Sequence, residues 1–464
     1  MTAARSWRPA CEDAHVLASP GAESTVAEGD ELVAFLYADL SGLNRGRAVP
    51  LRNLERSLRT GVGWVPADQA ITVLGPLAEP NPWGSLGDLR LVPDPETRTR
   101  VDLWPDLPPL HFMLCDALDL DGEPWDACPR FLLRGALERL ERETGLRLWA
   151  AFEHEFVLQG HSPAPPPAFS MEALRLAEPM GTQVAAALRL AGLHLENFLP
   201  EYGDDQFEVT VAPRTALAAA DAASIVRELV REIARRRGWR ASFAPLMRPD
   251  GSGNGVHVHM SFRDADGAPA THDHERPGGL SLVAGRFAAG VLAHLPAICA
   301  AGAPTPVSYL RLVPHRWSAG AACLAAGNRE AVLRIPTPTA FGGADPAAQA
   351  RLELRAADGA CSPHLLLALV VLAGLAGIRE RLEPPPVVIG DFYSLPEDEL
   401  RRLAIGRMPG SLAEAVDGFE TDAVVQTAVP RDLRDAYAAM KRTEIALLEA
   451  SSDEEGCARY ARIY

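Results

Sequence analysis

Four short segments of this chain combine the alternation of a β-strand with side chains that are costly to bury. They are residues 151–156, 206–209, 255–261 and 351–355. Successive side chains of a strand point to opposite faces, so Glu153 and Glu155 share one face, as do His257 and His259. Burying so many charges without partners would be prohibitive. We therefore expect these strands to form one sheet whose charged face binds divalent metal ions and a polyphosphate.

The overall composition limits the class of protein. With 464 residues, 47% of them hydrophobic, the chain can bury a large core and is expected to form more than one domain. The formal net charge of −16 argues against nucleic acid and anionic membranes as partners, because both require a basic surface. The 7 cysteines are scattered and never form Cys-x-x-Cys, which indicates a reduced protein of the cytoplasm.

The order of apolar and turn-forming residues predicts three regions. Residues 1–28 have no periodicity and are predicted to be a flexible arm. Residues 29–104 contain short strand-like runs, such as 32–37 and 70–74, and a larger domain is expected over residues 110–464. In that domain helices are predicted at 129–144 and 171–190. The longest apolar run, residues 365–378, is too short to span a bilayer and is expected to be a buried helix.

Taken together and in this order, the motifs resemble those of the glutamine synthetase superfamily. Residues 39–47 are similar to that family's Asp-x-x-Gly-x-x-Arg-Gly-Lys segment, and residues 87–94 to its Gly-Asp-x-x-x-x-Pro-Asp segment. Residues 151–156 match its Glu-x-Glu-Phe signature, and residues 252–261 its glycine-rich His-x-His-x-Ser strand. Two arginine motifs follow, at residues 310–314 and 328–334. The resemblance covers almost all of the chain after the arm.

The resemblance implies a fold, an assembly and two metal sites. The fold would be α+β, with an N-terminal β-grasp domain and a large catalytic domain whose curved antiparallel sheet is flanked by helices. Such proteins form homo-hexamers or dodecamers with active sites between subunits. The first metal, beside the glutamate substrate, would be held by Glu155, Glu201 and Glu208, and the second, against the ATP phosphates, by Glu153, His257 and Glu353. Carboxylates with a single imidazole suit Mg²⁺ or Mn²⁺ better than zinc.

The resemblance also assigns the remaining site residues. Phosphoryl charge would be neutralised by Arg329, Arg334 and Arg351. Carboxylate oxygens of glutamate and of the acyl phosphate would be bound by Arg311 and Arg355, with close backbone approach at Gly253. His259 and Ser261 would line the nucleotide side. The implied reaction is an ATP-dependent ligation, in which the glutamate γ-carboxylate attacks the γ-phosphate and an amine then displaces phosphate.

Two departures from the glutamine synthetase pattern concern the amine that accepts the glutamyl group. Trp317 stands where those enzymes have a glutamate that binds ammonium, and Val65 aligns best with their second ammonium ligand, an aspartate. A shift of three residues would instead place Asp68 there. A larger and less polar pocket favours an organic amine over ammonia. Two alternatives remain open, namely a true glutamine synthetase and a catalytically inactive structural or regulatory relative.

Overall fold

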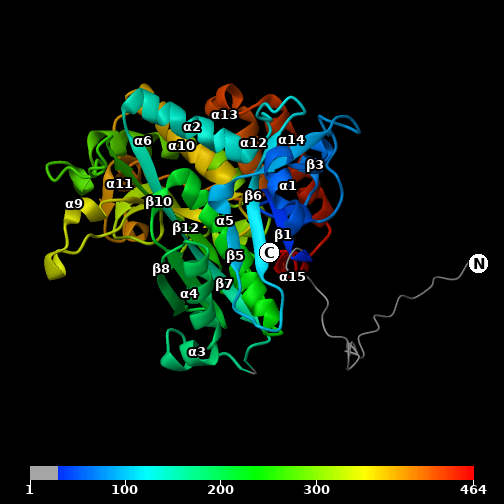
Figure 1. Ribbon diagram of the computed structural model, residues 1–464. Coiled ribbons are helices and arrows are strands. Elements are labelled where there is room, and N and C mark those ends of the chain that lie inside the picture. The colour runs from blue at the N-terminus through cyan, green and yellow to red at the C-terminus, as the bar shows by residue number, and fades with distance from the viewer. Residues whose placement is uncertain (1–29, 163) are drawn as a thin grey trace, which may run out of the picture.

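The computed structural model describes residues 30–162 and 164–464, so the predicted arm at residues 1–28 lies outside the described residues. The described chain contains two sheets, one in a small N-terminal domain and one in a large domain that carries most of the helices. In Figure 1 the small domain, in blue and cyan, lies along one side of the large domain. The predicted α+β fold with a small and a large domain is confirmed.

The small domain is built on a six-stranded sheet in the order β2-β1-β6-β4-β3, with β5 also paired to β6. Its central pair, β1 and β6, is parallel, whereas the other strand pairs are antiparallel. The strand that completes this sheet, β6, follows the proline-rich stretch at residues 104–109. The strands are β1 (Leu32–Ala38), β2 (Asn44–Pro50), β3 (Val62–Trp64), β4 (Leu89–Pro93), β5 (Thr99–Val101) and β6 (Leu110–Leu118).

Helical turns connect the strands of the small domain. They are α1 (Leu54–Thr60) and the 3₁₀ turns η2 (Leu51–Asn53), η3 (Pro66–Ala70) and η4 (Pro95–Thr97). The strand predicted at residues 70–74 does not form. Ile71 makes only an isolated bridge to Leu77, because the chain reverses at Gly75, whose φ of 114° is accessible mainly to glycine.

The large domain contains a ten-stranded sheet in the order β16-β13-β14-β15-β12-β7-β9-β8, and β10 and β11 also pair with β7. Pairing is antiparallel for the strands that carry the charged residues, as predicted, whereas β13 is parallel to β14 and β16. The strands are β7 (Arg147–Gln159), β8 (Leu195–Pro200), β9 (Gln206–Val211), β10 (Arg214–Thr215), β11 (Arg240–Ser242), β12 (Gly255–Arg263), β13 (Ala321–Ala326), β14 (Ala331–Ile335), β15 (Leu352–Asp358) and β16 (Val387–Ile389).

The central strand β7 shows why the sheet has one apolar and one charged face. Its residues alternate between buried and partly exposed along almost the whole strand. Phe152 and Phe156 are fully buried on one face, against which α5 packs, while Glu153 and Glu155 point to the other face. The apolar face therefore belongs to the core, and the charged face is left for the site.

Helices cover the apolar side of the sheet and build the C-terminal quarter. The apolar run at residues 365–378 forms α10 (Pro363–Arg379), which is almost wholly buried and packs on α6, α2 and α5. The other helices are α2 (Pro129–Thr144), α3 (Met171–Leu176), α4 (Met180–Leu190), α5 (Ala216–Arg236), α6 (Leu282–Ala293), α7 (Leu295–Gly302), α8 (Ser308–Arg311), α9 (Pro346–Gln349), α11 (Glu397–Arg402), α12 (Leu412–Thr421), α13 (Ala423–Ala428), α14 (Arg431–Leu448) and α15 (Asp453–Ala461), with short turns η5 (Pro277–Gly279), η6 (Phe341–Gly343) and η7 (Phe392–Ser394).

The predicted helices have mixed outcomes. The helix at 129–144 is confirmed as α2, and Gly145 ends it in the left-handed conformation. The helix predicted at 171–190 is instead two helices, α3 and α4. They are separated at Pro179, because proline offers no N–H for a helix and disfavours helical geometry in the residue before it. No single helix of the described chain is long and apolar enough to cross a membrane; α6 and α7 meet that test only as a pair, bent by 76°.

A buried arginine of α2 joins the two domains. Arg130 donates hydrogen bonds to Asp94 and Asp116 of the small domain and to Asp221 of α5, and His364 of α10 bonds the same Asp221. Burial opposes the charge of Asp221, but the bonds from His364 and Arg130 lower its pKa to about 2. The network therefore keeps two buried charges matched at the domain junction.

Replacing Arg130 with methionine is expected to lower the free energy of unfolding by about 3–5 kcal/mol, because it leaves Asp221 buried with fewer charge partners. Urea unfolding of the wild type and the variant measures this loss. Arg134→Met is the matched control, since Arg134 is more exposed and bonds only Asp116 in this network. Equal losses in the two variants would show that the buried network does not stabilise the junction.

Candidate active site

Strand register places the predicted ligands in rows across the charged face of the sheet. Glu153 of β7 lies directly opposite His257 of β12, and Glu155 lies opposite Glu208 of β9. On the other side of β12, where it pairs with β15, His259 lies opposite Glu353. Directly opposed residues have their side chains on the same face, within contact distance. The alternation read from the sequence therefore does bring the acids and histidines of four strands together.

Three glutamates gather at the β7–β9 end of this face. Glu155 accepts a hydrogen bond of 2.7 Å from the Gly255 amide, and Glu201 follows directly after β8. Burial, and then repulsion from Glu155, raises the pKa of Glu201 to about 7. Burial and the neighbouring glutamates raise the pKa of Glu208 to about 9. Acids that repel one another in this way are the oxygen ligands a divalent cation requires, so the predicted first-metal residues fit such an ion.

The second group surrounds Glu153. Its carboxylate lies 3.1 Å from His257 Nδ1 and 2.8 Å from His259 Nε2. Burial alone would raise the pKa of Glu153, but the hydrogen bonds to the two histidines lower it overall. Ligand atoms of Glu153, His259 and Glu353 lie within 4.8 Å of one another, as do those of Glu153, Glu208 and His257.

The family resemblance implies that His259 lines the nucleotide side, where Glu153 is also expected. Here His259 lies against Glu153 as closely as His257 does. Glu353 is paired with Arg334 at 2.6 Å and also with Arg355. Burial opposes the Glu353 charge, but the charges of His257 and Arg355 contribute to lowering its pKa to about 2. Glu353 is therefore ionised and available to a cation or to these arginines.

The predicted arginines rim the same face. Arg334 of β14 lies opposite Glu353, and Arg351, just before β15, donates to His259 Nδ1 at 3.1 Å. Arg329, in the turn before β14, is exposed, and its backbone carbonyl accepts a hydrogen bond of 2.8 Å from Arg355 Nε. Ser261 is on the same face of β12 as both histidines. These cations can neutralise a polyphosphate that bridges the acidic groups.

Arg311 and Gly253 contact each other beside this face. Arg311 is buried, donates to the carbonyls of Ala356 and Ala357 at 3.0 and 2.8 Å, and has its pKa lowered by burial. A Cβ atom on Gly253 would lie 2.4 Å from Arg311 Cδ, so glycine is required there to let this side chain pass. The sequence motif was interpreted as close approach to the substrate, and the described structure supplies this second, steric reason.

One residue that the sequence analysis did not assign organises the glycine-rich segment. Gln206 Nε2 donates to the Gly253 carbonyl at 2.8 Å and to the Asn254 side chain at 2.9 Å. Asn254 is buried and donates to the Ala244 carbonyl, so its amide is used within the protein. Gln206 appeared in the sequence only as the first residue of a predicted strand, which gave no sign of this role.

The loop that carries Trp317, residues 314–318, is called the acceptor loop below. Trp317 as a whole residue is 74% exposed, while its backbone carbonyl accepts a hydrogen bond of 3.2 Å from Arg355. Val65 precedes η3, which packs on α14. The acceptor loop contacts Tyr393 of η7, the element before α11, and α11 and β3 lie on opposite sides of the molecule (Figure 1). An amine pocket formed by both residues would therefore need a second chain, and it stays a prediction.

The two raised carboxylate pKa values predict how the metal-free protein responds to pH. Between the ordinary value of 4.5 and about 9, the folded state holds a proton on Glu208 that the unfolded state has released. The free energy of unfolding of the metal-free protein is therefore expected to fall as the pH rises through this window. Affinity for Mg²⁺ or Mn²⁺ is expected to rise over the same window, because the ligands must be deprotonated.

Denaturant unfolding in the presence of a chelator, at several pH values, measures the change in the free energy of unfolding. Isothermal titration calorimetry with Mn²⁺ at the same pH values measures the change in metal affinity. Glu208→Gln is the informative variant, since it is neutral at every pH and is expected to flatten the decline. A decline of equal steepness in wild type and variant would show that Glu208 is not the group that titrates.

The comparisons with known proteins agree with this site. Residues 126–460 match the glutamine synthetase catalytic domain, and residues 21–125 match the glutamine synthetase N-terminal domain. The chain belongs to the glutamine synthetase family, whose members of this kind are ATP-dependent carbon–nitrogen ligases.

Among curated relatives, the chain is 35% identical to a gamma-glutamylpolyamine synthetase of Streptomyces coelicolor, covering 93% of each chain. It is 30% identical to a glutamine synthetase of Methanocaldococcus jannaschii, over 89% of this chain and 91% of that protein. It is also 31% identical to a glutamate–isopropylamine ligase of a Pseudomonas species, over 92% of this chain and 94% of that protein. Among solved structures, a novel glutamine synthase homolog is 45% identical, with a TM-score of 0.87 over 95% of this chain and 100% of that one.

Proposed function

We propose that this protein is an ATP-dependent ligase that joins the γ-carboxylate of L-glutamate to an organic amine through a γ-glutamyl phosphate. The observation that carries the proposal is the sheet face on which acids, histidines and arginines of β7, β9, β12, β14 and β15 converge. Such a face pairs ligands for divalent cations with donors for phosphate, which is the set that phosphoryl transfer requires. The relatives with amine-ligase names support the same reaction class.

Each group has a part in the two steps. Bound Mg²⁺ or Mn²⁺ would be held by the glutamates and histidines of the two clusters, and would polarise the γ-phosphate and offset the charge on the reacting oxygens. Arg311 and Arg355 would bind carboxylate oxygens, which holds the γ-carboxylate in line with the phosphorus. Arg329, Arg334 and Arg351 would stabilise the negative charge that spreads over the transferred phosphoryl group.

The bonds formed and broken balance with ATP as the only activating reagent. In the first step a γ-carboxylate oxygen bonds to the γ-phosphorus, and the bond to ADP breaks. In the second the amine nitrogen bonds to the carbonyl carbon of the acyl phosphate, the bond from that carbon to the phosphate oxygen breaks so that inorganic phosphate leaves, and the amine loses a proton. Arg355 would act in both steps, since it contacts Glu353, Arg329 and the acceptor loop.

The preference for an organic amine rests on Trp317. Ammonium needs a small, anionic pocket, whereas an indole offers apolar contact and a face for a carbon-bearing cation. Trp317 is exposed, and its backbone carbonyl is bonded by Arg355, so we expect its indole to be available to cover such an amine. The second candidate is a glutamine synthetase that uses ammonia, which the Methanocaldococcus jannaschii relative favours.

The first test is to trap the intermediate. Purified protein with ATP, Mg²⁺, L-glutamate and hydroxylamine is expected to form γ-glutamyl hydroxamate, because hydroxylamine attacks acyl phosphates directly. Formation must depend on both ATP and glutamate. ATP cleavage without hydroxamate would contradict the proposed γ-glutamyl phosphate. Absence of ATP cleavage with both Mg²⁺ and Mn²⁺ would contradict it as well.

Assembly and location extend the proposal. We propose a homo-hexamer or dodecamer, because Val65 and Trp317 can share a pocket only across two chains. Mass photometry of the purified protein measures this directly. A cytoplasmic location is consistent with Cys115, Cys128, Cys299, Cys323, Cys361 and Cys457, which are all free and buried.

A further inference from the structure

The acceptor loop has a backbone that its own sequence does not favour. His315 has a φ of 64° and Trp317 a φ of 54°, both in the left-handed region. That region is uncommon for residues other than glycine and is an outlier for a bulky side chain such as tryptophan. Such conformations persist only where surrounding contacts impose them. Some group outside the loop must therefore hold it in this shape.

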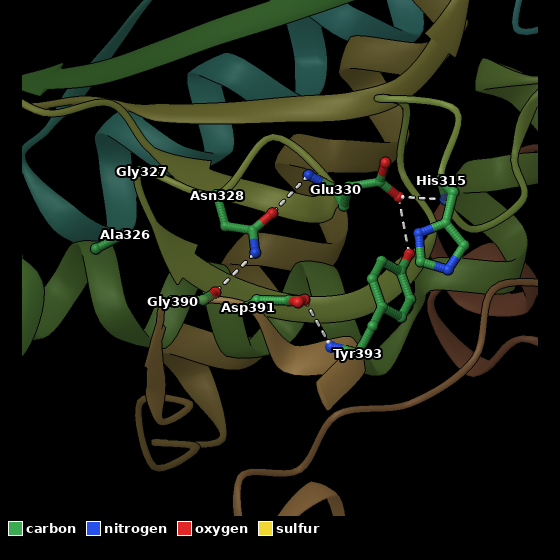
Figure 2. Close-up of a pocket in the computed structure, with 8 residues that line it drawn as sticks. All are labelled: His315, Ala326, Gly327, Asn328, Glu330, Gly390, Asp391 and Tyr393. Atoms are coloured by element: carbon green, nitrogen blue, oxygen red, sulfur yellow. Dashed lines mark hydrogen bonds between the residues drawn. The ribbon is translucent and has the colours of Figure 1, made fainter. Parts of the chain in front are cut away.

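That group is the carboxylate of Glu330. Its Oε1 accepts a hydrogen bond of 2.7 Å from the Trp317 amide, and its Oε2 accepts one of 3.1 Å from the His315 amide. The Tyr393 hydroxyl donates to the same Oε2 at 2.8 Å. Figure 2 shows the Glu330 carboxylate bonded to both His315 and Tyr393, whose rings lie side by side. One carboxylate thus bonds the amides of both left-handed residues.

Glu330 is itself held firmly. Its amide donates to the Asn328 side chain at 2.8 Å, and its carbonyl accepts from the Gly320 and Ala321 amides at 2.9 and 3.1 Å. Burial, followed by the bond to Glu330, raises the pKa of Tyr393 well above its ordinary value, so the hydroxyl remains a donor at every working pH. A carboxylate anchored in this way can impose a backbone shape on the loop that it contacts.

The shape matters because the loop also contacts the candidate catalytic groups. The Trp317 carbonyl accepts from Arg355 Nη2, and Arg355 Nε donates at 2.8 Å to the carbonyl of Arg329, the residue before Glu330. Glu330 therefore fixes the indole and the Arg355 contact from one anchor. Loss of its bonds would let Trp317 relax to an ordinary backbone shape and turn its side chain elsewhere.

We propose that Glu330 is the positioning residue of the acceptor loop and thereby determines which amine the enzyme accepts. The inference rests on the proposed ligase function and adds the residue that sets its acceptor specificity. Glu330 touches neither phosphate nor glutamate in this scheme. Its effect passes through the amides of His315 and Trp317.

A competing explanation is that Glu330 attracts a cationic amine by charge alone. Asp391 tests it, because it lies with Glu330 in the lining of a cavity of about 400 Å³ but does not bond the acceptor loop. Glu330→Asp keeps the charge and withdraws it from the amides. Glu330→Gln keeps the length, removes the charge, and turns an NH₂ group toward the donors. Asp391→Asn removes a charge from the same cavity and keeps an oxygen for the Tyr393 amide.

The experiment compares KM for the best organic amine among putrescine, ethanolamine and isopropylamine in the wild type and these variants. Losing bonds to a charged acceptor predicts a KM increase of about tenfold or more for both Glu330 variants. KM for ATP is expected to stay within about twofold of wild type, since the bonds that Glu330 accepts come from His315, Trp317 and Tyr393 and not from the arginines of the phosphate-binding rim. Asp391→Asn should match the wild type.

A rescue makes the test specific to backbone shape. Glycine adopts a positive φ without strain, so His315→Gly in the Glu330→Gln background is expected to recover part of the lost amine KM. If Glu330 acts by charge alone, His315→Gly restores nothing, Glu330→Asp keeps the wild-type amine KM, and Asp391→Asn changes the amine KM. Any one of these results overturns the proposal.

Two further outcomes are separable. If the wild type forms hydroxamate but amidates no amine, the proposed acceptor class fails rather than the role of Glu330, which then is tested with ammonium as acceptor. If both Glu330 variants fail to fold, Tyr393→Phe carries the test, because it removes one donor from the same carboxylate. It is expected to raise amine KM about threefold with KM for ATP unchanged, and no change would overturn the proposal.

Discussion

Replacing Arg329 with alanine is expected to lower kcat by roughly a thousandfold or more, because an arginine that neutralises phosphoryl charge contributes on that scale. The variant is expected to fold, since the Arg329 side chain is exposed and only its backbone carbonyl bonds Arg355. Glutamate-dependent ADP formation measures the loss, and ADP binding with thermal unfolding verifies that the protein is intact.

Arg248→Ala is the matched control for this prediction. Arg248 is an exposed arginine whose partners are Asp204 and Asp250. Its removal should leave kcat within about twofold, since exposed ion pairs contribute little. A kcat near wild type for Arg329→Ala would remove this residue from the phosphoryl-transfer step, and equal losses in both variants would indicate a general charge effect.

Replacing Trp317 with glutamate is expected to shift acceptor choice from an organic amine toward ammonium. The change puts a carboxylate where ammonium-using enzymes of the family carry one, and it removes the apolar surface that favours carbon-bearing amines. The ratio of kcat/KM for ammonium to that for the organic amine is expected to rise by about a hundredfold, the range that a single pocket contact can supply.

Two features keep this prediction interpretable. The backbone amide of residue 317 still bonds Glu330 in the variant, so the loop anchor is retained. Trp317→Ala separates loss of the indole from gain of the carboxylate, because it should weaken organic-amine use without improving ammonium use. If Trp317→Glu gains no ammonium-dependent turnover beyond that of Trp317→Ala, the indole does not determine acceptor choice.

Much of the site could be predicted from the sequence because its residues occupy alternate positions along predicted strands. The spacing of Glu153, Glu155, His257 and His259 predicted a shared face, and the strand pairs Glu153–His257 and Glu155–Glu208 bring those faces together. The register between strands could not be predicted from the sequence, since it depends on which strands become neighbours in the sheet. That is why the position of His259 against Glu153 and Glu353 emerged only from the fold.

The anchor of the acceptor loop could not have been predicted. Left-handed backbone is normally signalled by glycine or asparagine, and neither occurs at His315 or Trp317. Glu330 reaches back to amides 13 and 15 residues earlier and is met by a tyrosine 63 residues later. By contrast, the break at Pro179 has a signal in the sequence, because a proline inside a helical pattern ends or kinks the helix.

The central claim is that an organic amine, rather than ammonia, receives the glutamyl group. The most direct measurement is phosphate release with ATP, Mg²⁺ and L-glutamate in parallel reactions that contain ammonium, putrescine, spermine, ethanolamine, methylamine, isopropylamine or aniline, with the products identified by mass spectrometry. We expect at least one organic amine to give a γ-glutamyl amide with kcat/KM well above that of ammonium. Glutamine as the dominant product, with ammonium as the best acceptor, would contradict the claim.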